Sequence, residues 1–137
     1  MIALDRIAVG TVLPPLGAGE ITRTTLALFA GASGDHNPIH VDLDVARSAG
    51  LDDVFAHGML SMAYLARLLT DWVPQERIRT LEARFTAITP VHASPVCTGH
   101  VASIEQTPEG RVAVVEVSAA LADGTVTLTG TATIAID

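Results

Sequence analysis

The sequence predicts an α+β fold in which a curved antiparallel sheet wraps around one long apolar helix. A helical stretch from about His57 to Asp71 is apolar on nearly every face. After residue 78 the spacing of apolar residues changes from helical to alternating, which indicates strands. In a chain of 137 residues only those strands are available to cover the helix, so we expect them to curve around it.

The first helix is expected between Thr22 and Ala32. Residues 1–20 are rich in glycine and proline, which predicts turns and one short strand near Thr11–Leu13. Beyond them apolar residues recur at helical spacing, and the hydroxyl of Thr22 or Thr24 can cap the helix. This helix leads the chain into the polar segment described below.

Two further helices are expected before the strands begin. Asp42 can cap a short helix that runs through Ala49, and Gly50 stands where a left-handed residue closes such a helix. The long helix follows, and at about 1.5 Å per residue it spans roughly 22 Å. Because its whole surface is apolar, we expect it to be buried on all sides, and Pro74 ends it.

Four strands are expected in the second half of the chain, joined by tight turns. Turn residues stand at Pro108–Gly110 and again at Asp123 and Gly124, where glycine can adopt the positive φ that hairpin turns require. Strands joined by consecutive hairpins form an antiparallel meander. The expected strands are Arg79–Ile88, Thr98–Gln106, Val112–Leu121 and Thr125–Ile136.

Composition and charge exclude several classes of protein. With 49% hydrophobic and 17% charged residues, residues 1–137 are expected to form one globular domain with an apolar interface. The net charge of −7 argues against nucleic acid or anionic membrane as a partner, since both are bound by clustered basic residues. Cys97 is the only cysteine, which fits a cytoplasmic protein without a thiolate metal cluster. The most apolar stretch, Gly58–Leu69, contains Arg67 and is too short to span a bilayer.

The candidate site is the segment from Phe29 to His40. Six consecutive positions starting at Asp35 hold a carboxylate, two imidazoles, an amide and a proline, between segments of ordinary apolar core. Pro38 fixes its own φ near −65° and biases Asn37 toward an extended conformation, so the preceding helix cannot continue. Asp35 and His40 can then converge across the bend.

A metal site is the first alternative for this segment. Histidines four residues apart on a helix can hold a metal ion, and His36 and His40 have this spacing with Asp35 beside them. Pro38 lies between the two histidines and argues against a helix. We therefore expect no metal and no other cofactor, and an exposed His36. Taken alone, Asp35 could also be a simple turn residue after Gly34.

A first group of residues consists of Phe29, Ser33, Gly34, Asp35, Asn37, Pro38, Ile39, His40 and Ala46, and a second landmark of Ala56, His57, Gly58 and Met59. Their order resembles the signature of the MaoC-like, R-specific enoyl-thioester hydratases, and the resemblance covers nearly the whole chain. It implies a hot-dog fold that pairs as a dimer. It also implies reversible hydration of trans-2-enoyl thioesters, linked to CoA or acyl-carrier protein, to (3R)-3-hydroxyacyl thioesters.

The same resemblance implies roles for individual residues. Asp35 and His40 would jointly hold and activate the water, and the backbone N–H of Gly58 would bind the negative charge that develops on the thioester oxygen. The start of a helix suits that role, because its N–H groups are free and its dipole end is positive. Further residues expected to contact the substrate or shape the site are Asn37, Pro38, His57 and Met59.

Several alternatives stay open from the sequence. A hot-dog protein can also be a thioesterase, which activates water at the thioester carbonyl, or a non-catalytic acyl-thioester-binding subunit of a heterodimer. His57 can have a packing or hydrogen-bonding role, and Met59 can belong to the core. Some relatives carry a serine about two turns past the motif glycine; Ala66 stands at that distance here, while Ser61 lies three residues after Gly58. We expect a homodimer, with a heterodimer as the alternative.

Overall fold

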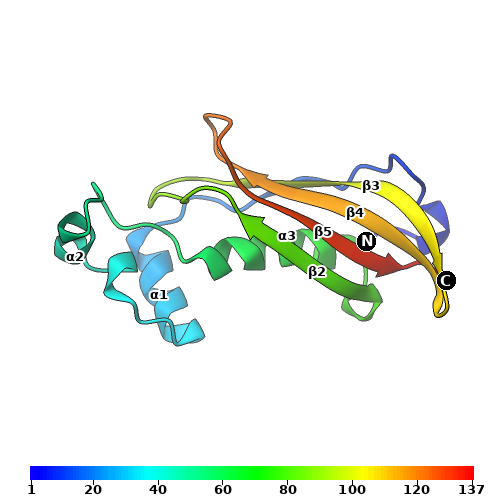
Figure 1. Ribbon diagram of the computed structural model, residues 1–137, viewed down its shortest axis with the longest axis horizontal. Helices are drawn as coiled ribbons and strands as arrows, with labels where there is room; N and C mark the ends of the chain where they lie inside the picture. Colours follow the sequence, from blue (N-terminus) through cyan, green and yellow to red (C-terminus); the bar gives the residue numbers. More distant parts are fainter.

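The structure is a computed structural model that describes residues 1–137. A five-stranded antiparallel sheet packs along helix α3 (Gly58–Trp72), while α1 (Arg23–Ser33) and α2 (Leu43–Ser48) lie together beyond one end of the sheet (Figure 1). Across the sheet the strands follow the order β1 (Leu16–Gly17), β3 (Val96–Thr107), β4 (Gly110–Ala120), β5 (Val126–Ala135) and β2 (Ile78–Phe85). This arrangement confirms the expected α+β hot-dog fold.

The sheet is a meander of β3, β4 and β5 with two strands added from earlier in the chain, β1 beside β3 and β2 beside β5. The expected meander of four consecutive strands is therefore wrong for the first of the four, because β2 pairs with β5 and not with β3. Consecutive hairpins connect β3, β4 and β5, and β2 pairs antiparallel with β5 at one edge. The register places Val115 of β4 opposite Val101 of β3 on one side and opposite Ala132 of β5 on the other.

The main core lies between α3 and the inner face of the sheet. Every second residue of β4 from Ala113 to Ala119 is buried, as the alternating pattern requires. Burying a large aliphatic or aromatic side chain contributes about 1.5–3 kcal/mol to folding, so the apolar face of α3 stabilises the contact substantially. That face consists of Leu65, Leu68, Leu69 and Trp72, each at most 4% exposed.

A second, smaller core connects α1 and α2 to the beginning of α3. Because this cluster includes residues on both sides of the polar segment, it fixes the segment relative to the start of α3. Its buried members are Ile21, Leu26, Ala46, Val54, Ala56, Leu60 and Val91.

Local signals place the ends of the short helices as the sequence predicts. The Thr22 hydroxyl accepts the N–H of Thr25, and the Thr25 hydroxyl accepts the N–H of Thr22, so α1 begins with a reciprocal cap. The Asp42 carboxylate accepts two N–H groups at the start of α2. Gly34 and Gly50 follow the two helices with φ of 75° and 87°, a conformation that favours glycine.

The expectation that the long helix is buried on all sides is wrong for the single chain. Met59 is 61% exposed, and Ala63, Arg67 and Asp71 are exposed on the same helix. The reason is that the sheet of one chain covers only one side of α3. None of the helices combines the length and apolar character needed to cross a bilayer.

Two predicted strand boundaries are also wrong. Around Thr11–Leu13 only Val12 pairs, through an isolated bridge to His100, and the edge strand forms later at β1. In β2 the ladder stops at Phe85 and does not continue to Ile88, because the next two N–H groups both turn to the carbonyl of Thr127.

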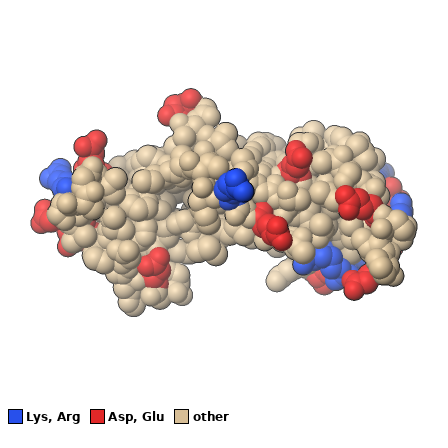
Figure 2. All heavy atoms as spheres, viewed as in Figure 1, with Lys and Arg blue, Asp and Glu red and all other residues tan.

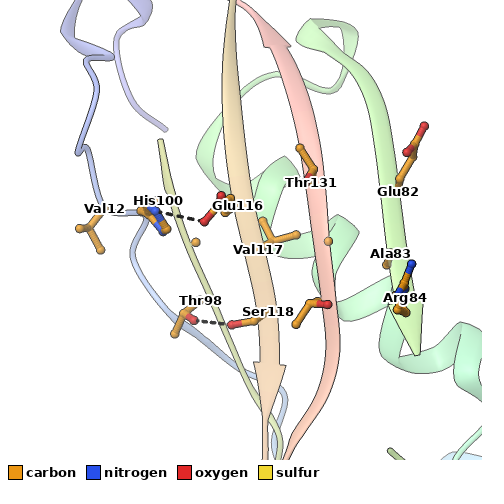
Figure 3. Close-up of a pocket in the computed structure, with 13 residues that line it drawn as sticks. Val12, Glu82, Ala83, Arg84, Thr98, His100, Glu116, Val117, Ser118 and Thr131 are labelled. Carbon is orange, nitrogen blue, oxygen red and sulfur yellow. Dashed lines mark hydrogen bonds and ion pairs between the residues drawn. The ribbon is translucent and has the colours of Figure 1, made fainter. Parts of the chain in front are cut away.

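The outer face of the sheet is polar and carries a hollow of about 810 Å³ (Figure 3). Cross-strand pairs line it: the hydroxyls of Thr98 and Ser118 lie 3.2 Å apart, and His100 lies 3.5 Å from the carboxylate of Glu116. None of the residues of the predicted site lines this hollow. The outer face is therefore a solvated sheet surface with paired polar groups.

We expect Gly130→Ala to lower the free energy of unfolding by about 1–3 kcal/mol. Gly130 lies on β5 opposite Ala83, and an added Cβ would overlap the backbone carbonyl oxygen of Glu82. The matched control is Gly31→Ala in α1, where a Cβ has open space, and where alanine is expected to raise stability by up to about 1 kcal/mol. Urea denaturation measures both variants, and equal stabilities would contradict the prediction.

Candidate active site

Three side chains from two segments of the chain converge at one end of α3. Asp35 follows α1, His40 ends a short 3₁₀ turn over Pro38–His40, and His57 directly precedes α3. Their side-chain nitrogen and oxygen atoms lie within 4.8 Å of one another. The Asp35 side chain is 53% exposed and that of His40 is 9% exposed, so the cluster opens to solvent on the Asp35 side.

The loop that carries Asp35 and His40 is held by its own side chains. The carboxylate of Asp35 accepts the N–H of Asn37 at 3.2 Å, and the amide oxygen of Asn37 accepts the N–H of Ile39 at 3.1 Å. Pro38 occupies the first turn of the 3₁₀ helix, where its missing N–H leaves no bond unmade. Asn37 and Pro38 thus shape the loop, while His36 is exposed and outside the cluster.

The orientation of His40 follows from one hydrogen bond. Its Nδ1 lies 2.8 Å from the carbonyl oxygen of Phe55, and since a carbonyl only accepts, Nδ1 carries the hydrogen. In the neutral ring the lone pair is then on Nε2, which lies 4.0 Å from the Asp35 carboxylate. A water molecule about 2.8 Å from both groups fits this separation, so the pair can hold one water between them.

His57 contacts both Asp35 and His40. Its Nε2 donates to the backbone carbonyl of Asp35 at 3.1 Å, and its ring stacks on His40 with centroids 4.0 Å apart. Phe29 packs against its other side at 4.9 Å. The ring is 1% exposed, and this burial lowers the pKa of His57 below its ordinary range. His57 is therefore neutral, and its position favours the packing and hydrogen-bonding role over direct contact with a substrate.

The three groups also form a set of candidate metal ligands. Imidazole lone pairs lie in the ring plane, and the planes of His40 and His57 are stacked at only 26° to each other. Two rings stacked in this way do not point their lone pairs at one common ion. The geometry favours proton transfer through His40 over coordination of a metal.

Gly58 presents a free N–H at the wall of a neighbouring pocket. It is the first residue of α3, and its N–H makes no hydrogen bond within the protein. The pocket has a volume of about 320 Å³, and its apolar walls include Phe55, Phe85, Ile88 and Leu128. A Cβ at position 58 would lie 3.0 Å from the Phe85 ring, so the close approach of this ring explains the glycine.

The pocket reveals residues that the sequence did not single out. Phe55 serves both parts of the site, because its carbonyl holds His40 and its ring lines the pocket. The only feature of the sequence that could have indicated Phe55 is its position just before His57 and Gly58. Phe85 and Ile88 are about half exposed at the pocket. Met59 is 61% exposed, so the alternative that it belongs to the core is wrong for the single chain.

The sequence matches a known protein family over most of its length. Residues 13–130 match the family model described as "MaoC like domain". The 3-hydroxyacyl-thioester dehydratase Z of Mycobacterium tuberculosis is 31% identical over 98 residues, which are 67% of this chain and 65% of that protein. The (R)-specific enoyl-CoA hydratase of Rhodospirillum rubrum is 29% identical over 119 residues, which are 87% of this chain and 82% of that protein.

Solved structures agree with these matches. A structure titled "MaoC-like dehydratase" superposes with a TM-score of 0.88 at 30% identity, over 98% of this chain and 42% of that one. The ChsH1-ChsH2 complex from Mycobacterium tuberculosis contains a chain of the same fold, with a TM-score of 0.82 at 23% identity, over 95% of this chain and 98% of that one. The chain thus spans less than two thirds of the length of the Mycobacterium dehydratase and of the solved dehydratase.

We expect His57→Gln to flatten the dependence of stability on pH. Because the pKa of His57 is lower in the folded protein, the unfolded chain takes up a proton first as the pH falls below about 6.5. Wild-type stability therefore decreases between pH 7 and pH 5, and the part due to His57 is absent in the variant. His36→Gln, which replaces an exposed histidine outside the buried cluster, is the control. Denaturation curves at several pH values test this, and parallel slopes for wild type and His57→Gln would contradict it.

Proposed function

Because this chain belongs to the MaoC-like dehydratase family, we propose that it adds water reversibly to trans-2-enoyl thioesters to form (3R)-3-hydroxyacyl thioesters. The observation that carries the proposal is the free Nε2 of His40, 4.0 Å from the Asp35 carboxylate, next to an apolar pocket lined by the free N–H of Gly58. A base, a water position and an oxyanion donor are what this reaction requires. The proposal covers both CoA and acyl-carrier-protein thioesters.

The proton transfers follow from the orientation of His40. Asp35 and His40 hold the water, and Nε2 of His40 accepts its proton as the oxygen adds to C3 of the enoyl group. The same proton then passes to C2, so that the elements of water are added across the double bond. Dehydration is the reverse of these steps. The neutral His57 keeps a second positive charge away from His40 when His40 becomes protonated.

Negative charge develops on the thioester oxygen while the C3–O bond forms. The N–H of Gly58 at the start of α3 is suited to bind it, because the groups at a helix N-terminus carry partial positive charge. The acyl chain would then occupy the pocket lined by Phe55, Phe85 and Leu128. Removing water from this pocket strengthens the hydrogen bond to the oxyanion.

Asp35→Asn and His40→Ala are each expected to reduce hydration of crotonyl-CoA by about 100-fold or more, the usual contribution of general acid–base catalysis. Loss of absorbance of the conjugated double bond measures the rate, and circular dichroism checks that the fold is intact. His36→Ala removes an exposed histidine of the same loop and is the matched control. Full activity in both site variants would refute the proposed mechanism.

A thiol reagent added to the same assay distinguishes a thioesterase from a hydratase. Hydration leaves the thioester bond intact, so no free thiol is expected while the absorbance falls. A thioesterase instead releases CoA in step with its reaction, and a non-catalytic binding subunit would give saturable binding without either signal.

We also propose that the chain pairs with a second copy of itself. The outer edge of β2 is unpaired in the sheet, and Phe85 at its end is exposed together with Ile88 on the pocket wall and Met59 in the first turn of α3. The exposed side of α3 and the 49% hydrophobic composition support the same proposal.

Light scattering of the purified chain is expected to give twice the mass of 14.3 kDa. A mass of one chain at micromolar concentration would contradict the homodimer and favour a different partner. Phe85→Glu, which places a charge at this apolar edge, is expected to shift the equilibrium toward the monomer. Glu105→Gln on β3 alters an exposed residue of another strand and is the control.

A further inference from the structure

The pocket wall contains a pair of buried hydroxyl groups that the proposed mechanism does not use. Ser61 is 3% exposed and Thr89 is 4% exposed, and both line the pocket beside Gly58. Their side-chain oxygens lie 3.4 Å apart, at the long end of hydrogen-bonding distance. Two buried polar groups in a pocket with largely apolar walls indicate a place where a polar atom of a ligand is bound.

One of the two hydroxyl hydrogens of Ser61 and Thr89 is not used within the protein. Each hydroxyl has one hydrogen to donate and can accept from others. The contact between Ser61 and Thr89 uses one of the two hydrogens, and neither side chain makes another hydrogen bond within the protein. One hydroxyl hydrogen is therefore available to an acceptor in the pocket.

The direction of Ser61 places this donor near Gly58. Ser61 lies three residues after Gly58, so the two residues share one face of α3. Side chains on a helix tilt toward its N-terminus and cover the preceding turn, which brings the Ser61 hydroxyl toward the Gly58 N–H. Both donors can thus reach one acceptor atom.

The segment that carries Thr89 does not need the contact between Ser61 and Thr89 to stay in place. The N–H of Ala56 donates to the carbonyl of Thr89 at 2.8 Å, and Phe55 and Pro90 form a β-bridge. Backbone hydrogen bonds therefore already attach the segment that carries Thr89 to the segment before α3. A further weak bond between two buried hydroxyls adds little to that attachment.

We infer that Ser61, oriented by Thr89, is a second hydrogen-bond donor to the thioester carbonyl oxygen, alongside the N–H of Gly58. Thr89 donates to the Ser61 oxygen, which leaves the Ser61 hydrogen free for the substrate. A neutral ground-state carbonyl accepts this bond weakly, and the oxyanion of the transition state accepts it strongly. The inference deepens the proposed function by assigning a specific residue to its oxyanion site.

The test compares two ligands that differ only in the carbonyl oxygen. Butyryl-CoA has the thioester oxygen, and S-butyl-CoA, the corresponding thioether, lacks it. Ser61→Ala is expected to weaken butyryl-CoA binding about fivefold, the effect of one lost neutral hydrogen bond, and to leave S-butyl-CoA binding unchanged. Isothermal titration calorimetry measures both affinities. Equal weakening of the two ligands, or of neither, would overturn the inference.

Turnover provides the second measurement. Ser61→Ala is expected to lower kcat for crotonyl-CoA by about 100-fold, the typical effect of removing one oxyanion donor, with a much smaller change in KM. Ser61→Thr keeps the hydroxyl and should retain most of the activity. Ser61→Cys nearly preserves the side-chain volume but offers only a weak donor. It should therefore show the same loss of kcat, and it keeps the test valid if Ser61→Ala folds poorly.

Ser118→Ala is the matched control, because it removes one partner of the similar hydroxyl pair with Thr98 on the outer face of the sheet. It should bind both ligands and turn over crotonyl-CoA like the wild type. An activity loss in Ser61→Ala that only follows a lower melting temperature would assign the pair a structural role and overturn the inference. If the wild-type chain binds butyryl-CoA but hydrates no enoyl-CoA, the proposed function fails, whereas the two-ligand comparison still tests Ser61.

Discussion

Leu65, Leu68, Leu69 and Trp72 bury one face of α3 against the sheet, and the position of the site depends on this contact. Once that face is fixed, the first turn of α3 must lie at the end of the sheet where β2 stops. The pocket forms between this first turn and the segment that follows Phe85. Because the helix cannot rotate without exposing its apolar face, Gly58 and Ser61 must both face the pocket.

The polar groups of the site lie where the second core meets the start of α3. On one side, α1 and α2 hold the loop that ends at His40, and on the other, the chain approaches α3 through Phe55 and His57. Two hydrogen bonds connect these sides, from His40 to the carbonyl of Phe55 and from His57 to the carbonyl of Asp35. The connection leaves Asp35 open to solvent and His40 largely covered, which allows water to enter beside an oriented imidazole.

Charged side chains contribute little to the stability of the fold around the site. Figure 2 shows acidic and basic side chains scattered over a mostly uncharged surface. Several of the charges are paired near the surface, such as Arg23 with Asp53 at 2.7 Å and Arg67 with Asp71 at 3.6 Å, and exposed pairs of this kind stabilise a protein little. The site instead combines one exposed carboxylate with neutral donors and an apolar wall. Such a site suits an uncharged enoyl group better than an anion.

The sequence by itself determined the features that depend on neighbours along the chain. The caps at Thr22 and Asp42, the left-handed Gly50 and the alternating strands all follow from local conformational preferences, and the structure confirms them. The motif around Asp35 and His40 indicated the family because its residues lie within a few positions of one another. The spacing also predicted that the long helix would begin at about His57, within one residue of Gly58, where α3 starts.

Only the tertiary structure decided which distant residues complete the site. His40 and Phe55 are 15 residues apart, Asp35 and His57 are 22 apart, and Ser61 and Thr89 are 28 apart. No periodicity in the sequence records such contacts, because they arise from the packing of α3 between the sheet and the second core. The exposed side of α3 was missed for the same reason: an apolar residue has the same sequence signal whether its own chain covers it or leaves it for another surface.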